Sequence, residues 1–266
     1  MIDSILFDKN GLVYLPRLIS SDKNYWRSKL AFREGECLEA DDRIEICASD
    51  KFAVDLVNKQ IMVPSSVGER ALCYLTRVAT DYLLTLRGVL PLHAAAVSLG
   101  NWHILVFAKP GGGKSRLSEL ICGAEPAARV IGDDHIVIFD KYIQGNLSRR
   151  LRNLTVRGEH YKRNTGYANR KKTLAVCYDP QSCSQNTCRP LNMRDWFRKI
   201  EELTAFKYLC SNFLMNDFCY DIKSLFGKEV ISNYHGSAAK IIDAEKRLLI
   251  SGTQIEAVEV IRSFVH

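Results

Sequence analysis

The sequence has no Cys-x-x-Cys pair, although it contains nine cysteines among its 266 residues. The nearest grouping, Cys177, Cys183 and Cys188, has spacings of six and five residues, which fit no common zinc site. The cysteine count is odd, and the N-terminus lacks a basic stretch followed by an apolar one. These features predict a cytoplasmic protein with reduced thiols, most of them acting as small hydrophobic residues.

Proline is also scarce, and long uncharged runs are few. Seven prolines and 16 glycines exclude collagen-like and proline-rich low-complexity chains. The longest stretch without Asp, Glu, Lys or Arg is 88–108, and the turn residues at 99–101 favour a hairpin over a membrane helix. We therefore expect no membrane partner.

The composition is that of a folded protein with a mild positive charge. Hydrophobic residues make up 47% and charged residues 25%, which excludes disorder of the whole chain. A net charge of +7 suits a partner that carries phosphates or carboxylates. No aromatic-rich basic motif accompanies this charge, so we expect no nucleic-acid partner.

The hydrophobic patterns predict an α/β protein with a β-rich region at 1–65 and a larger domain at 66–266. Period-two and continuous apolar runs predict strands, and three- and four-residue spacings predict helices. The strands are expected at 13–15, 30–32, 44–46, 61–63, 92–99, 103–108, 128–131, 135–139, 142–143 and 174–178. The helices are expected at 65–86, 116–122, 193–214 and 255–264, and a mobile basic loop at 161–172.

Residues 108–115, Ala-Lys-Pro-Gly-Gly-Gly-Lys-Ser, match the P-loop pattern G-x-x-x-x-G-K-[ST] except for Ala108. An apolar strand precedes the motif and a helix follows it, which is the setting that a P-loop requires. Glycines let backbone N–H groups converge on a phosphate, and the helix N-terminus adds positive potential there. The residues expected to bind the nucleotide are Lys109, Pro110, Gly111, Gly112, Gly113, Lys114, Ser115 and Arg116.

Side chains near this motif complete a predicted site for phosphoryl transfer. Lys114 is expected to bridge the β- and γ-phosphates, and the Ser115 hydroxyl to join a Mg²⁺ shell. Asp133 and Asp134 follow the next strand, where one carboxylate can hold Mg²⁺ and the other can accept a proton. His93 lies on the strand before the P-loop strand, and its small apolar neighbours allow either a core histidine or a site residue.

The ordered motifs Leu92-His93-Ala-Ala-Ala-Val97, Pro110–Ser115 and Gly132-Asp133-Asp134 resemble those of HPr kinase/phosphorylase and its shorter relatives found beside peptide-maturation genes. The resemblance covers residues 88–180 and implies a P-loop fold related to phosphoenolpyruvate carboxykinase, with a mixed sheet and flanking helices. It also implies that His93 lies in the active site, that Asp133 accepts the proton of a target serine and that Asp134 lies close to the metal. Family members often form oligomers, so a homo-oligomer is an expectation for this chain.

The chain departs from the family pattern downstream of the acidic pair. Where the family has a metal-binding glutamate in a Leu-Glu-Val-Arg-Gly-like stretch, this chain has Thr155, followed at a distance by Glu159. This difference puts a second metal contact and the reverse, phosphorylase activity in doubt. The family's catalytic arginine has its nearest counterparts in the basic run Arg170, Lys171 and Lys172, with Arg163 as an alternative and Arg157 as a further candidate phosphate contact.

Together these observations predict an ATP- and Mg²⁺-dependent kinase with Asp133, His93 and Lys114 as catalytic residues. The acceptor is expected to be a hydroxyl, a serine of a peptide or small protein. Two alternatives remain open: a kinase of small-molecule hydroxyls, and a nucleotide-binding module with little catalysis. The basic segment 148–172 is either a lid that clamps phosphates or an acidic peptide, or a solvated surface loop.

Overall fold

The computed structural model describes residues 4–8, 13–15, 26, 33–34, 40–109, 111–139, 142–145, 167–169, 172–180, 187–203, 213–215, 218–220 and 246–266. These residues form an α/β structure with mixed sheets. Its helices are α2 (Glu69–Leu86), α3 (Lys114–Ala124), α5 (Met193–Leu203) and α8 (Gln254–Val265).

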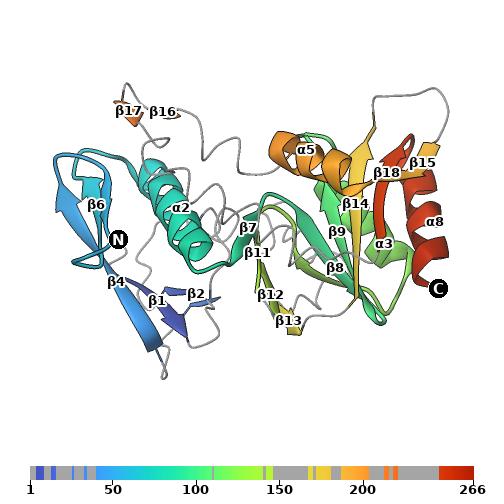
Figure 1. Ribbon diagram of the computed structural model, residues 1–266, viewed down its shortest axis with the longest axis horizontal. Helices are drawn as coiled ribbons and strands as arrows, with labels where there is room; N and C mark the ends of the chain where they lie inside the picture. Colours follow the sequence, from blue (N-terminus) through green and yellow to red (C-terminus); the bar gives the residue numbers. More distant parts are fainter. Residues whose placement is uncertain are drawn as a thin grey trace.

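The main sheet has six strands in the order β10-β8-β9-β14-β18-β15 (Figure 1). The strands are β8 (Ala95–Leu99), β9 (Trp102–Phe107), β10 (Arg129–Gly132), β14 (Lys172–Asp179), β15 (Thr187–Pro190) and β18 (Lys246–Ser251). β9, β14 and β18 are parallel to one another, whereas β8 is antiparallel to both β9 and β10. The carboxyl ends of β9, β10, β14 and β18 therefore meet at one edge of the sheet.

Alternating side chains of the main sheet divide between two hydrophobic clusters, as the two-residue period of a strand requires. Ile104 and Val106 of β9 pack in the cluster that contains α3 and α8, whereas Leu105 and Phe107 pack in the cluster that contains α5. On the α5 side, the rings of Phe107 and Trp196 meet edge to face, with centroids 5.2 Å apart. The strand that precedes the P-loop is thus buried on both faces.

Two further sheets lie on the N-terminal side of the main sheet (Figure 1). One has the order β13-β12-β11-β7, formed by β7 (Leu90–Leu92), β11 (Ile136–Ile138), β12 (Tyr142–Gly145) and β13 (Tyr167–Asn169). The other has the order β3-β2-β1-β4-β6-β5, formed by β1 (Ser4–Asp8), β2 (Val13–Leu15), β3 (Arg33–Glu34), β4 (Ala40–Ser49), β5 (Ala53–Asp55) and β6 (Gln60–Pro64). A separate pair, β16 (Phe213–Met215) and β17 (Phe218–Tyr220), is antiparallel.

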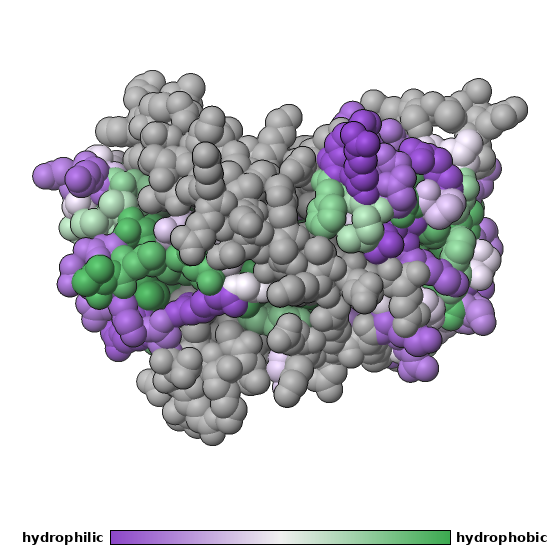
Figure 2. Space-filling model, viewed as in Figure 1, coloured by the Kyte–Doolittle hydropathy of each residue, from purple (hydrophilic) through white to green (hydrophobic). Residues whose placement is uncertain are grey.

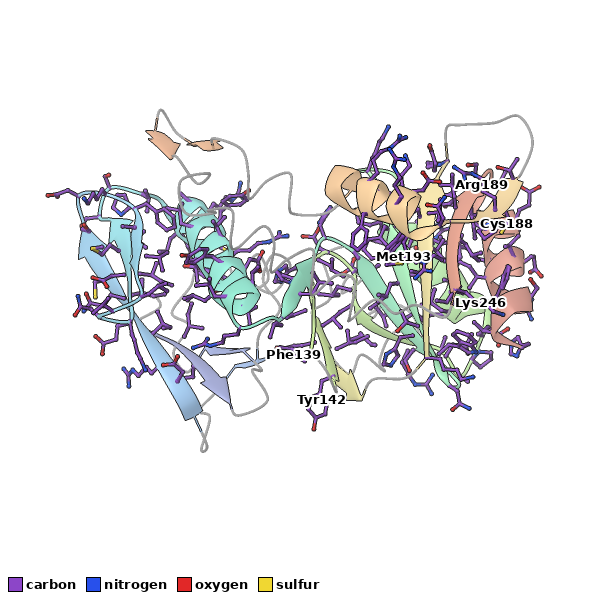
Figure 3. All side chains as sticks on the ribbon, in the orientation of Figure 1. Phe139, Tyr142, Cys188, Arg189, Met193 and Lys246 are labelled. Carbon is purple, nitrogen blue, oxygen red and sulfur yellow. The ribbon has the colours of Figure 1, made fainter. Side chains whose placement is uncertain are left out.

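Helix α2 joins the N-terminal sheet to the sheet that contains β11. One hydrophobic cluster contains Ile5 and Ile61 of the N-terminal sheet, Val78 of α2, and Val137 and Phe139 from β11 and its end. Figure 3 shows Phe139 at this junction, where its side chain is buried. A shift of α2 would therefore disturb both sheets.

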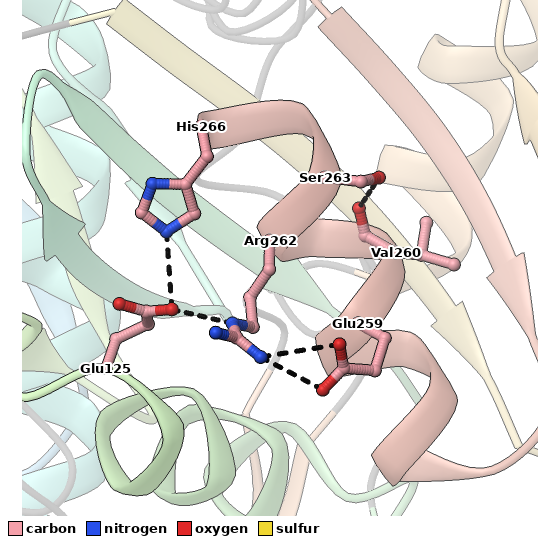
Figure 4. A network of polar contacts seen from close by, with 6 residues as sticks. All are labelled: Glu125, Glu259, Val260, Arg262, Ser263 and His266. Carbon is pink, nitrogen blue, oxygen red and sulfur yellow. Dashed lines mark hydrogen bonds and ion pairs between the residues drawn. The ribbon is translucent and has the colours of Figure 1, made fainter.

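A polar network ties the C-terminal helix to the end of α3 (Figure 4). The Nε of Arg262 donates to Glu125 Oε1 at 2.6 Å, and the Arg262 guanidinium also pairs with Glu259 on its own helix. His266 Nε2 lies 3.3 Å from the same Glu125 oxygen. The hydrogen bond from Arg262 holds the pKa of Glu125 below its ordinary value. α8 begins with a capping box in which Thr253 and Glu256 cap each other's backbone N–H groups.

The predicted helix at 65–86 is confirmed, beginning at Glu69, and the hairpin at 99–101 is confirmed between β8 and β9. The prediction of one strand over 92–99 is wrong, because the chain leaves β7 and enters β8 of a different sheet at His93 and Ala94. The helix predicted to reach residue 214 is also wrong at that end, where β16 pairs with β17. The strand predicted at 30–32 lies outside the described residues.

The mobile basic loop predicted at 161–172 is corrected in part. Tyr167–Asn169 form β13, which pairs with β12, and Lys172 begins β14. These strands were not evident from a composition of Lys, Arg, Asn and Gly, because the formation of a strand depends on pairing partners elsewhere in the sequence. The rest of this segment, with Arg163 and Arg170, lies outside the described residues, as does Arg157.

The surface of α5 is strongly polar. Figure 2 shows hydrophilic side chains gathered over this helix, where Arg194 and Arg198 are exposed while Trp196 is buried beneath them.

Cys73, Cys122 and Cys177 are buried, one in each hydrophobic cluster, as small hydrophobic residues. Burial raises the pKa of the Cys122 thiol to about 12.

In the part of the chain that the structure describes, no helix is long and apolar enough to cross a membrane.

Candidate nucleotide-binding and catalytic site

Three segments meet at the carboxyl edge of the main sheet because of its strand directions. β9 ends at Phe107 and leads into the P-loop, and β10 ends at Gly132 and leads into Asp133 and Asp134. β8 lies between them and runs the opposite way, so its amino end, which follows His93, reaches the same edge. In open α/β sheets such an edge is the usual place for ligands.

The P-loop backbone adopts conformations that favour glycine. Gly111 has φ +77° and Gly113 has φ +90°, both in the left-handed region. A Cβ on Gly112 would lie 2.9 Å from the Lys109 carbonyl oxygen and 3.0 Å from Ala108 Cβ. Gly113 also begins α3 with no side-chain cap. The start of this helix is therefore free of side-chain caps, as an anion-binding N-terminus requires.

The ammonium group of Lys114 is held inside the site by two acceptors. Lys114 is 7% exposed, and its Nζ lies 3.0 Å from His93 Nε2 and donates to the Ala108 carbonyl oxygen at 3.2 Å. Ala108, the departure from the motif, is fully buried and contributes this carbonyl. A bound phosphate would offer the lysine a charged acceptor in place of these neutral ones.

His93 links the P-loop lysine to the acidic turn. Its Nδ1 lies 3.0 Å from the Asp134 carbonyl oxygen and 3.4 Å from Asp134 Oδ1. An ammonium group can only donate, so Nε2 must accept from Lys114, and Nδ1 carries the proton that it donates to Asp134. The structure thus places His93 in the site and in the break between two strands, where the sequence alone left a core role open.

Burial, followed by the charge of Lys114, lowers the pKa of His93 from 6.5 to about 3. The carboxylate of Asp134 opposes this effect, and Arg77 adds to it. His93 is therefore neutral at physiological pH and can accept a hydrogen bond from the lysine. The same shift makes the fold less stable in acid, because the unfolded chain takes up the proton below pH 6.5 and the folded chain does so only near pH 3.

We expect ¹⁵N NMR of the imidazole ring to report a neutral His93 at pH 5 with its proton on Nδ1. Replacing Lys114 with methionine should raise the pKa of His93 and leave it below 6.5, because burial is the larger cause. Titration of wild-type His93 near 6.5 would contradict the arrangement of these three side chains.

The two carboxylates of the acidic turn lie in different surroundings. Asp133 is 1% exposed, whereas the side chain of Asp134 is 17% exposed and faces His93. Different surroundings allow two carboxyl groups to take different roles. Asp133 is therefore shielded from solvent, and Asp134 is partly accessible.

The remaining predicted residues divide into those at the site and those elsewhere. Ser115 is the second residue of α3. Lys109 is exposed and lies two residues after the end of β9. Arg116 pairs with Glu119 along the helix at 2.5 Å. Pro110, Thr155, Glu159 and Lys171 lie outside the described residues.

Lys172 does not lie at the predicted site. It pairs in register with Trp102 at the amino end of β9, and its Nζ lies 5.7 Å from the centre of that indole ring. Ala108 follows Trp102 by six residue steps along an extended strand, a distance of roughly 20 Å. Lys172 is therefore excluded as the equivalent of a phosphate-binding arginine.

Sequence reasoning missed contributions from the C-terminal part of the chain. Gln254, the first residue of α8, lies against the P-loop, and a Cβ on Gly113 would collide with its Nε2 and approach the Tyr178 ring at 3.8 Å. The Tyr178 hydroxyl donates to the Gly252 carbonyl oxygen at 2.8 Å. The Thr-x-x-Glu capping pattern at 253–256 was the available signal for where this helix begins.

The residues present fit a magnesium nucleotide. A serine hydroxyl and carboxylate oxygens are the donors that Mg²⁺ prefers, and Mg²⁺ usually takes only one or two carboxylates beside the substrate phosphates. Within the described residues no cluster of three or more His, Cys, Asp or Glu could hold a metal ion. Ser115 and Asp134 are the described residues that offer donors of this kind beside the P-loop motif and on the acidic turn.

No model of a known protein family matches the chain, and no curated protein matches it.

Proposed function

We propose that this protein is an ATP-dependent kinase that transfers the γ-phosphate to a hydroxyl group, a serine of a peptide or small protein. The observation that carries this proposal is the position of His93, whose ring contacts both Lys114 of the P-loop and the Asp133–Asp134 turn. The fold that we propose is the P-loop fold related to phosphoenolpyruvate carboxykinase. The mixed sheet, with the P-loop strand next to an antiparallel neighbour, supports it.

The reaction assigns a role to each group. The nucleotide phosphates would lie on the backbone of Gly111–Gly113 and at the start of α3, with Lys114 on the β- and γ-phosphates. Ser115 and Asp134 would hold Mg²⁺, which would supply charge neutralisation for the transferring group. Asp133 takes the proton of the acceptor hydroxyl, whose oxygen bonds to the γ-phosphorus as the bond to the β–γ bridging oxygen breaks. ADP leaves with that oxygen.

The arginine that would neutralise the remaining charge is assigned to the basic segment, with Arg157, Arg163 and Arg170 as the candidates from the sequence. Cytoplasmic location, a peptide or small-protein partner and assembly into a homo-oligomer belong to the same proposal.

The test begins with binding and ends with transfer. Purified protein would be titrated with a fluorescent ATP analogue, with and without Mg²⁺, and then incubated with Mg²⁺·ATP and serine-containing peptides encoded near its gene. We expect a peptide to gain one phosphoryl mass in the mass spectrum. Binding without transfer to any peptide would favour a small-molecule acceptor or a nucleotide-binding module, and absence of nucleotide binding would overturn the proposal.

A further inference from the structure

A buried polar contact joins α2 to the residue that follows the acidic turn. His135, the residue after Asp134, places its Nε2 2.7 Å from Asp81 Oδ1. Both side chains are 1% exposed. The two residues are 54 positions apart in the sequence, so only the tertiary fold brings them together.

Asp81 is itself held in place on α2. Arg77, one helical turn earlier, has its Nε 3.7 Å from Asp81 Oδ2. The Thr85 hydroxyl donates to the Asp81 carbonyl oxygen at 2.7 Å. A carboxylate buried this deeply is costly unless it is paired, so the contact restricts where His135 can lie.

The helix that carries Asp81 is a firm support. Val78 and Leu84 of α2 are buried in the cluster shared with the N-terminal sheet, and Val137 and Phe139, just after His135, pack in that same cluster. The chain on the far side of the turn is therefore fixed by packing, and His135 is fixed by Asp81. Arg77 also acts on the site directly, since its charge contributes to the lowered pKa of His93.

We infer that Asp81 and His135 are positioning residues that hold the Asp133–Asp134 turn in place for Mg²⁺ and the acceptor. The inference rests on the proposed function, because it assigns the turn a role in binding magnesium nucleotide. The contact with Asp81 reaches the turn through His135, which directly follows Asp134. The N-terminal region, through α2, thus becomes part of the machinery that orients the carboxylates.

The experiment measures how strongly Mg²⁺ enhances binding of a fluorescent ATP analogue. Asp81→Leu keeps the approximate size of the side chain and removes the oxygen that contacts His135. It should reduce this enhancement roughly 10-fold, as loss of a residue that orients a metal ligand commonly does, and leave Mg²⁺-free binding unchanged. His135→Asn should do the same, because its amide nitrogen is one bond too short to replace Nε2. His135→Gln places an amide nitrogen as many bonds from Cα as Nε2 and should restore most of the enhancement.

Val78→Ala is the matched control, because it removes buried contacts from the same helix without touching His135. Urea unfolding of every variant separates lost stability from lost positioning. The inference is overturned if the Mg²⁺ enhancement survives in Asp81→Leu and His135→Asn. It is also overturned if the enhancement falls as far in His135→Gln and Val78→Ala as it does in His135→Asn. Wild-type protein that binds no nucleotide would overturn the proposed function instead. Asp134→Asn serves as the reference for the loss of a proposed metal ligand.

Discussion

Replacing Asp133 with asparagine should reduce phosphoryl transfer by roughly 10²- to 10⁴-fold, the usual contribution of a general base. The amide has the shape of the carboxyl group and cannot take the proton of the acceptor hydroxyl. Asp133 is 1% exposed, so an isosteric change disturbs the packing of the turn least. Binding of Mg²⁺·ATP should remain, because Ser115 and Asp134 are the groups proposed to hold the metal. Single-turnover transfer, followed by mass spectrometry, measures the effect.

Asp134→Asn is the comparison that separates the two carboxylates. It should weaken Mg²⁺-dependent nucleotide binding, because Asp134 is the carboxylate proposed to hold the metal. Asp134 is the more exposed of the two carboxylates and faces His93. If Asp133→Asn lost Mg²⁺-dependent binding and Asp134→Asn kept it, the two roles would be reversed. If neither change affected transfer, the acidic turn would not be the catalytic centre.

Replacing Gly113 with alanine should reduce the affinity for Mg²⁺·ATP roughly 10- to 100-fold, which corresponds to the loss of one charge-assisted hydrogen bond. The residue has φ +90°, where an L-amino acid is strained, and its Cβ would collide with Gln254 Nε2. The Gln254 side chain can turn away from the new Cβ, but relief of the strained φ moves the backbone at the start of α3, where the phosphates are proposed to bind. Titration with a fluorescent ATP analogue measures the change.

Gly123→Ala is the matched control in the same helix. Gly123 is near the end of α3, and a Cβ there meets nothing within 4 Å. Alanine favours the helix by up to about 1 kcal/mol, so this variant should unfold at a higher urea concentration and bind nucleotide normally. Equal affinities in the two alanine variants would show that the conformation of Gly113 is not needed for phosphate binding.

The conformation of the glycine-rich loop was predictable from the sequence because all of its determinants are local. An apolar strand, three consecutive glycines and a helix that begins at Lys114 are adjacent in the chain, and each adopts the expected conformation. The alternation of Ile104, Leu105, Val106 and Phe107 between two hydrophobic clusters likewise follows from a continuous apolar strand. The acidic turn was found by the same local logic, since Asp133 directly follows a strand.

The tertiary structure alone decided which side chains meet at the loop and which do not. His93 reaches Lys114 and Asp134 because the chain changes sheets at that residue, a break that its apolar neighbours conceal. Lys172 lies at the amino end of β14, opposite to the end of the sheet that carries the P-loop. Its position depends on the register of β14 with β9, which is a long-range property. Asp81 and Gln254 join the site from helices far away in the sequence. Local spacing determines backbone conformation, but contacts between distant side chains depend on sheet order and packing, which no short stretch of sequence contains.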